Sequence, residues 1–162
     1  MPELSHVDTH GKAHMVDVGD KPETVREARA RGAVVMQPST LELIQRNAVQ
    51  KGDVLAVAKI AGIMAAKRTS ELIPLCHPLP LASIELTFRF DAKEARIDIE
   101  STARVTSKTG VEMEALTAVA AAALTVYDMC KAVDREMRIT DIRLIEKRGG
   151  RSGVFRRSGE SL

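Results

Sequence analysis

The feature that most constrains this chain is a long apolar stretch near its centre. From Ala115 to Tyr127, only two threonines interrupt a run of apolar residues. A helix that is apolar on all sides must be covered on all sides, so this stretch predicts the central helix of the fold. Ionisable residues lie only beyond the two ends of the run. The ones nearest to it are Glu112, Glu114, Asp128, Lys131 and Asp134.

Three of these residues, Glu112, Asp128 and Lys131, also have structural explanations. Thr109 and Glu112 have the spacing of a capping box, in which two side chains satisfy free backbone amides at the start of a helix. Asp128 and Lys131 are three residues apart and share a helix face, so a surface ion pair worth about 0.3 kcal/mol would also explain them. Glu114 has no comparable structural explanation.

The composition predicts one globular domain over residues 1–162. A chain of this length buries roughly two thirds of the surface of its unfolded form, which is enough for one core. Lys and Arg number 24 against 22 Asp and Glu, so no overall field attracts nucleic acid or an anionic membrane. Aromatic residues make up 2% of the chain, and single-strand binders stack bases on aromatic side chains. We therefore expect no nucleic-acid partner.

The cysteines and the N-terminus favour a protein of the cytoplasm. The two cysteines suit a reducing compartment. Cys76 and Cys130 are too few for a disulfide framework or a thiolate metal site, so we expect free thiols and no bound metal ion. The N-terminus has no basic region followed by an apolar one, and we expect no run to reach the ~20 apolar residues of a membrane span. We expect a soluble cytoplasmic protein without a membrane partner.

The first regular element is predicted to be a helix over residues 22–32. Pro22 suits a first helical turn, and Gly32 suits the left-handed position after a helix end. Arg26 then lies on a mostly polar helix, where most arginines are solvated. A short strand is expected over residues 33–36.

Two further helices are predicted before the middle of the chain. Ser39 and Glu42 have capping-box spacing and predict the start of the first. Asp53 is expected to cap the second, whose apolar residues between 54 and 65 form one stripe. Lys51 lies at the corner between them. A lysine in the last turn of a helix complements the helix dipole, and that alone would also explain it.

The segment after the third helix is a stiff, apolar loop. Three prolines within seven residues exclude regular structure there: Pro74, Pro78 and Pro80. His77 is its one side chain that titrates near neutral pH. A lone histidine is commonly only a hydrogen-bonded side chain, but rigid surroundings are also what a binding site requires.

The second half of the chain predicts an antiparallel hairpin followed by a helix and a strand. Residues 83–90 and 97–105 alternate between apolar and polar side chains, as half-buried strands do. The last strand, over residues 137–144, changes phase at Thr140 and Asp141, which indicates a bulge. The order of elements is that of a ferredoxin-like α+β sandwich, in which helices pack on one face of an antiparallel sheet.

Both ends of the chain are polar, and we expect residues 1–13 and 149–162 to be mobile. The C-terminal segment is rich in Gly, Ser and Arg. Lys147, Arg148 and Arg151 lie among glycines and could close over a phosphate, although a solvated basic tail is the commoner case.

Several motifs together resemble those of one known family, in order and spacing, over roughly residues 14–153. They are M-V-D-V at 15–18, K-G-D-V at 51–54, A-A-K-R-T at 65–69, L-I-P-L-C-H-P-L at 72–79, K-T-G-V-E-M-E-A-L-T at 108–117, Y-D-M-C-K-A at 127–132 and G-G-R-S-G at 149–153. By these motifs the chain resembles the MoaC family, the cyclic pyranopterin monophosphate synthases of molybdenum cofactor biosynthesis.

The resemblance implies a lyase that needs no metal or redox cofactor. Its substrate would be a cyclised dihydro-GTP, 3',8-cyclo-7,8-dihydroguanosine 5'-triphosphate, which is rearranged to cyclic pyranopterin monophosphate with release of pyrophosphate. The catalytic candidates are Asp128, Lys51, Lys131 and His77. The substrate-binding candidates are Leu75, Cys76, His77, Met113, Glu114, Glu112, Arg26, Lys67 and Lys147.

The length of the central helix adds an expectation about assembly. Glu114 and Asp128 are fourteen residues apart, which is about 21 Å along a helix, too far for one small substrate to contact both easily. If both ends are functional, the site lies between subunits, and the family likeness favours a homohexamer built as a trimer of dimers. An alternative is a non-catalytic, ferredoxin-like regulatory module that binds a nucleotide with the same cations and loop.

Overall fold

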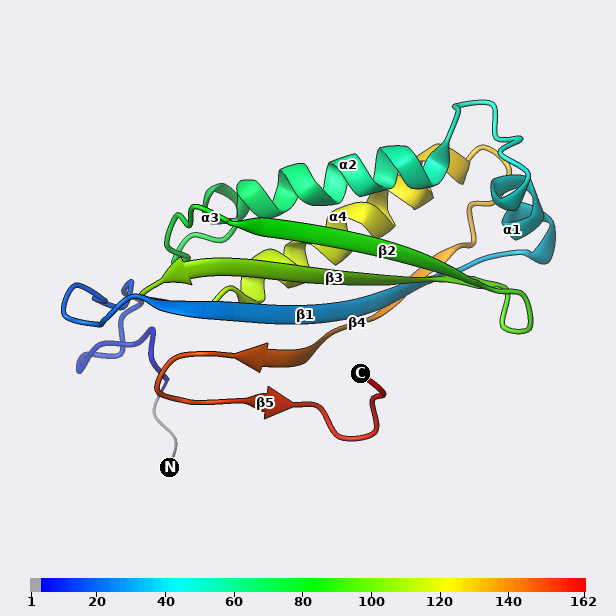
Figure 1. Ribbon diagram of the computed structural model, residues 1–162. Coiled ribbons are helices and arrows are strands. Elements are labelled where there is room, and N and C mark those ends of the chain that lie inside the picture. The colour runs from blue at the N-terminus through cyan, green and yellow to red at the C-terminus, as the bar shows by residue number, and fades with distance from the viewer. Residues whose placement is uncertain (1–3) are drawn as a thin grey trace.

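An antiparallel sheet of five strands carries the helices on one face (Figure 1). The structure is a computed structural model that describes residues 4–162. The strands are β1 (Thr24–Val35), β2 (Ser83–Asp91), β3 (Arg96–Ser107), β4 (Arg138–Arg148) and β5 (Phe155–Arg156). The helices are α1 (Pro38–Gln45), α2 (Val54–Lys67), α3 (Thr69–Leu72) and α4 (Glu112–Cys130).

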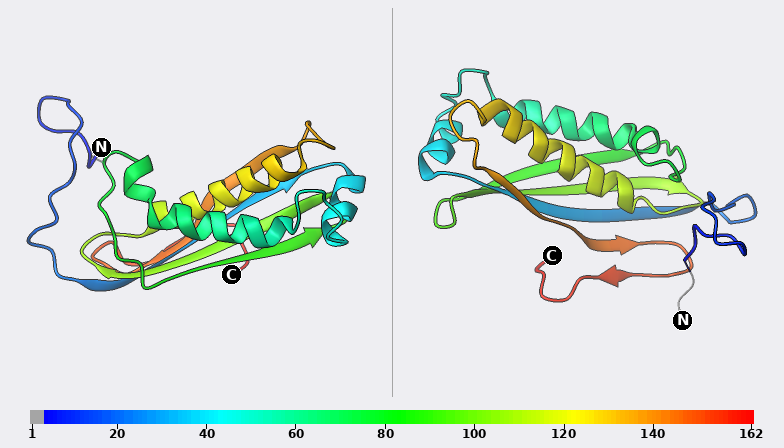
Figure 2. Two further views of the ribbon diagram at one scale, coloured as in Figure 1. Left: turned by 90° about the horizontal axis from the view of Figure 1, so that it is seen from above. Right: turned by 180° about the vertical axis from the view of Figure 1, so that it is seen from behind.

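The strand order confirms the predicted fold class. The strands lie in the order β2-β3-β1-β4-β5, and every neighbouring pair is antiparallel. The first four strands therefore form a ferredoxin-like sheet, with β5 added at its edge. Helices α2 and α4 lie side by side across one face, and α1 lies at one end of the sheet (Figure 2). The predicted hairpin of residues 83–90 and 97–105 is confirmed as β2 and β3.

The helix predicted over residues 22–32 is wrong, because residues 24–32 of it belong to β1. The segment T-V-R-E-A-R-A-R-G is rich in helix-forming residues, but Ala28 and Ala30 point into the core while Arg29 and Arg31 stay partly exposed. Pairing with β3 on one side and β4 on the other decides in favour of the strand. Gly32 is inside this strand, and a Cβ atom there would lie 2.7 Å from Cγ1 of Val119 on α4.

Of the two helix caps predicted in the first half of the chain, one is confirmed and one is wrong. Asp53 caps α2 as expected, and its Oδ1 accepts a hydrogen bond of 3.0 Å from the amide of Ala56. The capping box of Ser39 and Glu42 is wrong, because α1 begins at Pro38 without a cap from its own first residues. Buried Asp134 takes that role instead. Its Oδ2 accepts from the amide of Gln37 at 2.8 Å and from the hydroxyl of Thr40 at 3.0 Å. A cap supplied from 94 or more residues away leaves no local signal in the sequence.

Helix α4 is the predicted central helix, and it packs against β1, β3 and β4 of the sheet and against α2 beside it (Figure 2). Nine of its residues are buried, among them Ala115, Ala118 and Val126. The hydroxyl of Ser101 on β3 donates a buried hydrogen bond of 2.6 Å to the carbonyl of Ala115. By length and composition α4 could also cross a membrane, contrary to the expectation that no run is long enough, but half of its apolar stretch is buried inside the protein.

The C-terminal half of the sheet contains the predicted irregularity. Asp141 has a φ of 58°, and the register between β1 and β4 shifts between Arg31 and Ala33. This is the bulge expected at Thr140 and Asp141. Beyond β4, residues 155–156 pair with β4 as β5, and Glu160 forms ion pairs with arginines of β1 and β4.

The mobility of the two ends stays a prediction. The structure gives contacts for parts of both ends, including an isolated β-bridge between Val7 and Ala13. Residues 1–3 of the N-terminal segment lie outside the described residues.

The contact between α2 and α4 gives a testable prediction at Gly62. A Cβ atom on Gly62 would lie 2.9 Å from the carbonyl oxygen of Ala118 and 2.6 Å from Cδ2 of Leu86. The Leu86 side chain can rotate away, but the carbonyl belongs to the backbone of α4. We expect Gly62→Ala to lower the free energy of unfolding by about 1–3 kcal/mol, measured by chemical denaturation. Lys59→Ala, on the exposed side of α2, is the control and should change it by less than about 0.5 kcal/mol. Stabilisation of Gly62→Ala by about 1 kcal/mol, as helix propensity alone predicts, would contradict the close contact.

Candidate active site

Asp128 lies between two lysines at the C-terminal end of α4. Its Oδ1 accepts a hydrogen bond of 2.6 Å from Nζ of Lys131, and its Oδ2 lies 3.3 Å from Nζ of Lys51. Lys51 also donates a bond of 3.0 Å to the carbonyl oxygen of Asp128. The structure thus brings together three of the four catalytic candidates, two of them 77 residues apart in the sequence.

The electrostatics of this group keep the Asp128 carboxyl ionised. The hydrogen bond from Lys131, and then the one from Lys51, hold the pKa of Asp128 below its usual value. The side chains of Lys51, Asp128 and Lys131 are 48%, 59% and 52% exposed, so solvent screens their ion pairs, which add little to stability. The structural explanation of Lys51 as part of the last turn of its own helix is wrong, because α1 ends at Gln45. Two cations on one exposed carboxylate therefore contribute little to holding the fold together.

A second group of candidates lies at the N-terminal end of α4. Glu114 is only 4% exposed, and this burial raises the pKa of its carboxyl to about 7. The nearby charge of Glu112 acts in the same direction. A carboxyl with this pKa is close to half-protonated at neutral pH, so it can donate or accept a proton. Met113 between them is 36% exposed and offers an apolar contact.

The capping box expected at Thr109 and Glu112 is wrong. The N-cap of α4 is Val111, and no described side chain caps this end with a hydrogen bond. Glu112 therefore does not form the capping hydrogen bond that its spacing from Thr109 suggested. Its carboxylate lies over the backbone of Gly110, where an added Cβ atom would collide with it.

The loop with Leu75, Cys76 and His77 lies at the same end of the molecule. All three side chains are half-buried. Nε2 of His77 lies 2.8 Å from the carbonyl oxygen of Val16, so the histidine ties this loop to the N-terminal segment. Burial raises the pKa of the Cys76 thiol, and the charge of Glu114 raises it further, which places the two side chains near each other. The structure thus separates His77 from the other three catalytic candidates.

The remaining cationic candidates belong to the end with Glu114. Arg26 donates from Nε to the carbonyl of Ser107 and from Nη2 to that of Lys108, both at 3.1 Å, just before α4 begins. Lys147 pairs with Ala28 across the sheet, two positions beyond Arg26 on β1. Lys67 is exposed at the C-terminal end of α2, shortly before the Leu75–His77 loop.

The candidates therefore form two groups in one chain, at opposite ends of α4. The group at the C-terminal end of α4 contains Lys51, Asp128 and Lys131. The group at the N-terminal end of α4 contains the remaining candidates, which are Arg26, Lys67, Leu75, Cys76, His77, Glu112, Met113, Glu114 and Lys147. In residues 4–162, no three His, Cys, Asp or Glu side chains are grouped as a metal site.

The sequence predicted no functional role for residues 16–24, yet they lie beside the group at the N-terminal end of α4. Val16 contacts His77, and Nζ of Lys108 donates a bond of 2.6 Å to the carbonyl of Gly19. Lys21 and Thr24 line a cavity with Arg26. The M-V-D-V motif at 15–18 is the sequence signal that marks this segment.

The fold and the two groups define a ferredoxin-like α+β protein with ionisable side chains grouped at both ends of its central helix. Comparison with known proteins gives a more specific result. The family model described as "MoaC family" matches residues 15–150.

Relatives named cyclic pyranopterin monophosphate synthase are similar over nearly their whole length. The protein of Thermomicrobium roseum is 61% identical over 160 residues, which are 99% of this chain and 96% of the relative. That of Chloroflexus aggregans is 63% identical over 155 residues, 96% of this chain and 94% of the relative. That of Heliobacterium modesticaldum is 57% identical over 155 residues, 96% and 98% of the two chains. The chain therefore belongs to the MoaC family.

The raised pKa of Glu114 predicts a specific dependence of stability on pH. The folded-state pKa of about 7 exceeds the usual 4.5, so folding favours the protonated carboxyl. The stability this gives is fully present below pH ~4.5 and is lost as the pH rises through ~7. We expect the unfolding free energy of the wild type, relative to Glu114→Gln, to fall by about 3 kcal/mol between pH ~4 and ~8. Denaturant titrations over this range measure the difference, with exposed Glu71→Gln as the control substitution. A difference that stays constant with pH would show that Glu114 titrates normally.

Proposed function

We propose that this chain is a cyclic pyranopterin monophosphate synthase, a lyase of molybdenum cofactor biosynthesis. It converts the cyclised dihydro-GTP nucleotide to cyclic pyranopterin monophosphate and releases pyrophosphate. The observation that carries this proposal is the placement of Asp128 between Lys51 and Lys131. The names of relatives that match over nearly the whole chain support it.

The reaction opens and recloses rings and forms a cyclic phosphate, so it requires proton donors and acceptors beside several negative charges. Lys131 and Lys51 each hold a proton within hydrogen-bond range of the Asp128 carboxylate. A lysine that gives its proton to a leaving or developing oxyanion becomes a neutral amine, and the adjacent carboxylate favours its return to the ammonium form by a proton from water. The same two positive charges attract the phosphates of the substrate. Asp128, Lys51 and Lys131 are therefore assigned the acid–base steps.

The other end of α4 suits the ring system of the substrate. Leu75 and Met113 present apolar surface for a flat purine or pterin. Glu114, with a pKa of about 7, can hydrogen-bond ring nitrogens as donor or acceptor. His77 is fixed by its bond to Val16 and is assigned to contact substrate at the edge of this surface.

The separation of the two groups supports a site shared between subunits. Glu114 and Asp128 are about 21 Å apart along α4, so one small substrate reaches both groups only when a second copy supplies one of them. A two-fold axis would bring the N-terminal end of one α4 to the C-terminal end of the other, and would form two such sites. We infer a homohexamer built as a trimer of dimers.

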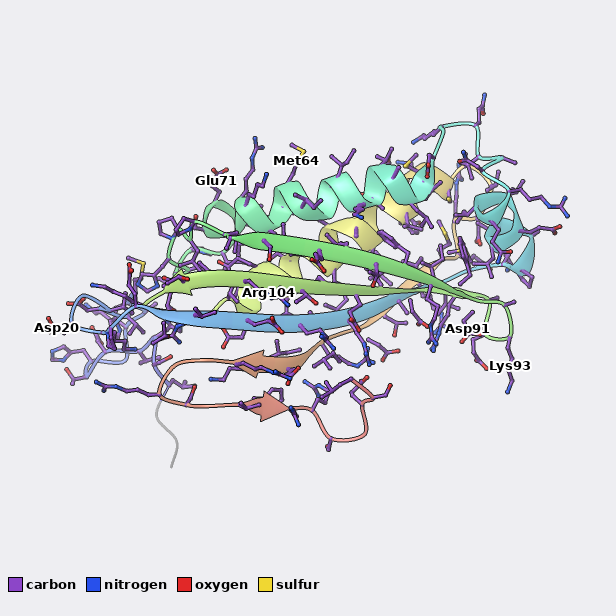
Figure 3. All side chains as sticks on the ribbon, in the orientation of Figure 1. Asp20, Met64, Glu71, Asp91, Lys93 and Arg104 are labelled. Atoms are coloured by element: carbon purple, nitrogen blue, oxygen red, sulfur yellow. The ribbon has the colours of Figure 1, made fainter. Side chains whose placement is uncertain are left out.

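The outer face of the helices offers apolar surface for such contacts. Val57, Ile60 and Met64 on α2 and Leu124 on α4 are 44% to 61% exposed. Figure 3 shows Met64 pointing away from the sheet. Exposed apolar residues grouped in this way are typical of interfaces.

The remaining expectations about partners follow from the same assignment. We infer a cytoplasmic enzyme that acts on a small nucleotide, without a nucleic-acid or membrane partner. The near balance of charges supports this. So does the location of the apolar helix α4, which packs against both the sheet and α2.

A single assay separates this function from the alternative of a regulatory nucleotide-binding module. The purified chain is incubated with the cyclised nucleotide, and released pyrophosphate is measured together with the pterin product. A synthase releases pyrophosphate over many turnovers. A binding module retains the nucleotide without releasing any, and that result would refute the proposed function.

The acid–base assignment predicts the behaviour of lysine variants. Lys51→Ala and Lys131→Ala should each lower kcat at least about 100-fold, while the free energy of unfolding changes by less than about 1 kcal/mol. Lys131→Arg should not restore activity, because an arginine keeps its proton and serves only as a phosphate clamp. The matched control is Lys93→Arg, in the turn between β2 and β3. Full activity of Lys131→Arg would contradict proton transfer by Lys131.

A further inference from the structure

The buried side chain of Asp134 joins the end of α4 to the start of α1. It is only 5% exposed, and its Oδ2 accepts hydrogen bonds from the amide of Gln37 and the hydroxyl of Thr40. Among the hydrogen bonds of residues 4–162, these two alone connect α1 and its N-cap to the segment that follows α4. Because α1 lies at the end of the sheet where α4 ends (Figure 1, Figure 2), Asp134 sets the position of one helix relative to the other.

On the side of α4, the Asp134 carboxylate is held close to the last helical turn. The amide of Asp134 donates to the carbonyl of Cys130 at 3.1 Å. The hydroxyl of Tyr127 donates to the carbonyl of Arg135 at 3.0 Å, which ties the following residue to the same turn. Asp128 lies in that turn, so the positions of the Asp134 and Asp128 carboxylates are fixed relative to each other.

On the other side, α1 leads directly into the turn that carries Lys51. The amide of Ala48 donates back to the carbonyl of Leu43 in α1 at 2.9 Å, and the amide of Gly52 donates to the carbonyl of Val49 at 3.0 Å. Lys51 therefore lies on a hydrogen-bonded turn built on the C-terminal end of α1. A rotation of α1 about its core contacts would move Lys51 away from α4.

The thiol of Cys130 shows how closely these groups are placed. Burial raises the pKa of this thiol, the charge of Asp134 raises it further, and the charge of Lys51 lowers it. Both charged groups therefore lie near the same buried side chain.

Capping α1 does not by itself require a buried carboxylate. A local serine, threonine or asparagine caps a helix without taking a charge out of water. Here the cap comes instead from the segment that also carries Lys131, and neutral donors satisfy it, the third being the amide of Glu136 at 3.2 Å from Oδ1. What Asp134 adds to a cap is the connection between α1 and the end of α4.

We propose that Asp134 is a positioning residue for Lys51, because its two hydrogen bonds to α1 fix the turn that carries Lys51 against the end of α4. This connection maintains the approach of Lys51 Nζ to within 3.3 Å of Asp128 Oδ2. The consequence for catalysis rests on the proposed function, in which Lys51 takes part in the acid–base steps. Proton transfer requires its groups at hydrogen-bond distance, so Asp134 supports the reaction without touching the substrate.

The first test needs no turnover and follows the pKa of Asp128 by carbon-13 NMR of the full-length chain. Hydrogen bonds from Lys131 and Lys51 hold this pKa below its usual value. Asp134→Ala should raise the pKa of Asp128 as Lys51→Ala does, because both remove the contact of Lys51. In a chain that already carries Lys51→Ala, Asp134→Ala should cause no further rise.

A milder variant and a matched control complete this test. Thr40→Val removes one of the two bonds to α1 and should raise the pKa of Asp128 less than Asp134→Ala does. The control is Asp8→Ala, which removes an aspartate that likewise accepts two hydrogen bonds, in the N-terminal segment, and should leave the pKa of Asp128 unchanged. A wild-type pKa of Asp128 in both Asp134→Ala and Thr40→Val would overturn the proposal.

Turnover assays test the consequence for catalysis. Asp134→Ala should lower kcat about tenfold, because a small displacement of an acid–base group is costly, and should cause no further loss in a Lys51→Ala chain. Asp134→Asn should keep kcat within about twofold of the wild type, because an amide oxygen still accepts both bonds from α1. Equal losses in Asp134→Asn and Asp134→Ala would contradict the proposal, since the charge of Asp134 and not its connection to α1 would then matter.

The two measurements separate this proposal from the proposed function. A chain that releases no pyrophosphate from the nucleotide, yet shows the raised pKa of Asp128 in Asp134→Ala, would refute the proposed function and leave the positioning role intact. An active enzyme whose Asp128 keeps its wild-type pKa in Asp134→Ala and in Thr40→Val would do the reverse.

Discussion

The close approach of backbone to α4 on both of its sides is the constraint on which the rest of the structure depends. Gly32 on β1 faces Val119 of α4, and Gly62 on α2 faces the carbonyl of Ala118, with no room for a Cβ atom at either glycine. Buried alanines between these contacts keep the helix surface flat enough for sheet and helix to pack against it. Because α4 is fixed in this way, the positions of its two ends are fixed as well.

The two ends give their carboxyl groups opposite properties. Glu114 is buried at one end, which raises its pKa to about 7, while the lysines around exposed Asp128 lower the pKa of that carboxyl. Carboxyls whose pKa values are pushed apart commonly divide the roles of proton donor and acceptor. The proposed reaction needs both roles. The same α4 that organises the core therefore also places the candidate groups for the chemistry, provided that two chains meet.

The sequence predicted what depends on local pattern. The apolar run of α4, the alternation in β2 and β3 and the cap at Asp53 are periodic or short-range signals, and the structure confirms them. The predictions from sequence are wrong where contacts between residues far apart in the chain determine the local structure. Most of β1 was predicted as a helix because Pro22 and Gly32 suit the two ends of one, whereas pairing with β3 and β4 makes it a strand. The cap of α1 comes from Asp134, far along the chain. For the same reason the contact of Lys51 with Asp128 came only from the family likeness, since nothing in the spacing brings them together.

Mixing two inactive variants tests the central claim, that one site uses opposite ends of α4 from two chains. Glu114→Ala and Asp128→Ala chains are unfolded together in equal amounts and refolded, and exchange of subunits is verified by mass-labelled copies. With random pairing, half of the dimers are mixed, and each has one site with both substitutions and one with neither. The account predicts recovery of about a quarter of wild-type activity from two inactive parents. A mixture that stays inactive although its subunits have exchanged would place the whole site within one chain and contradict the account.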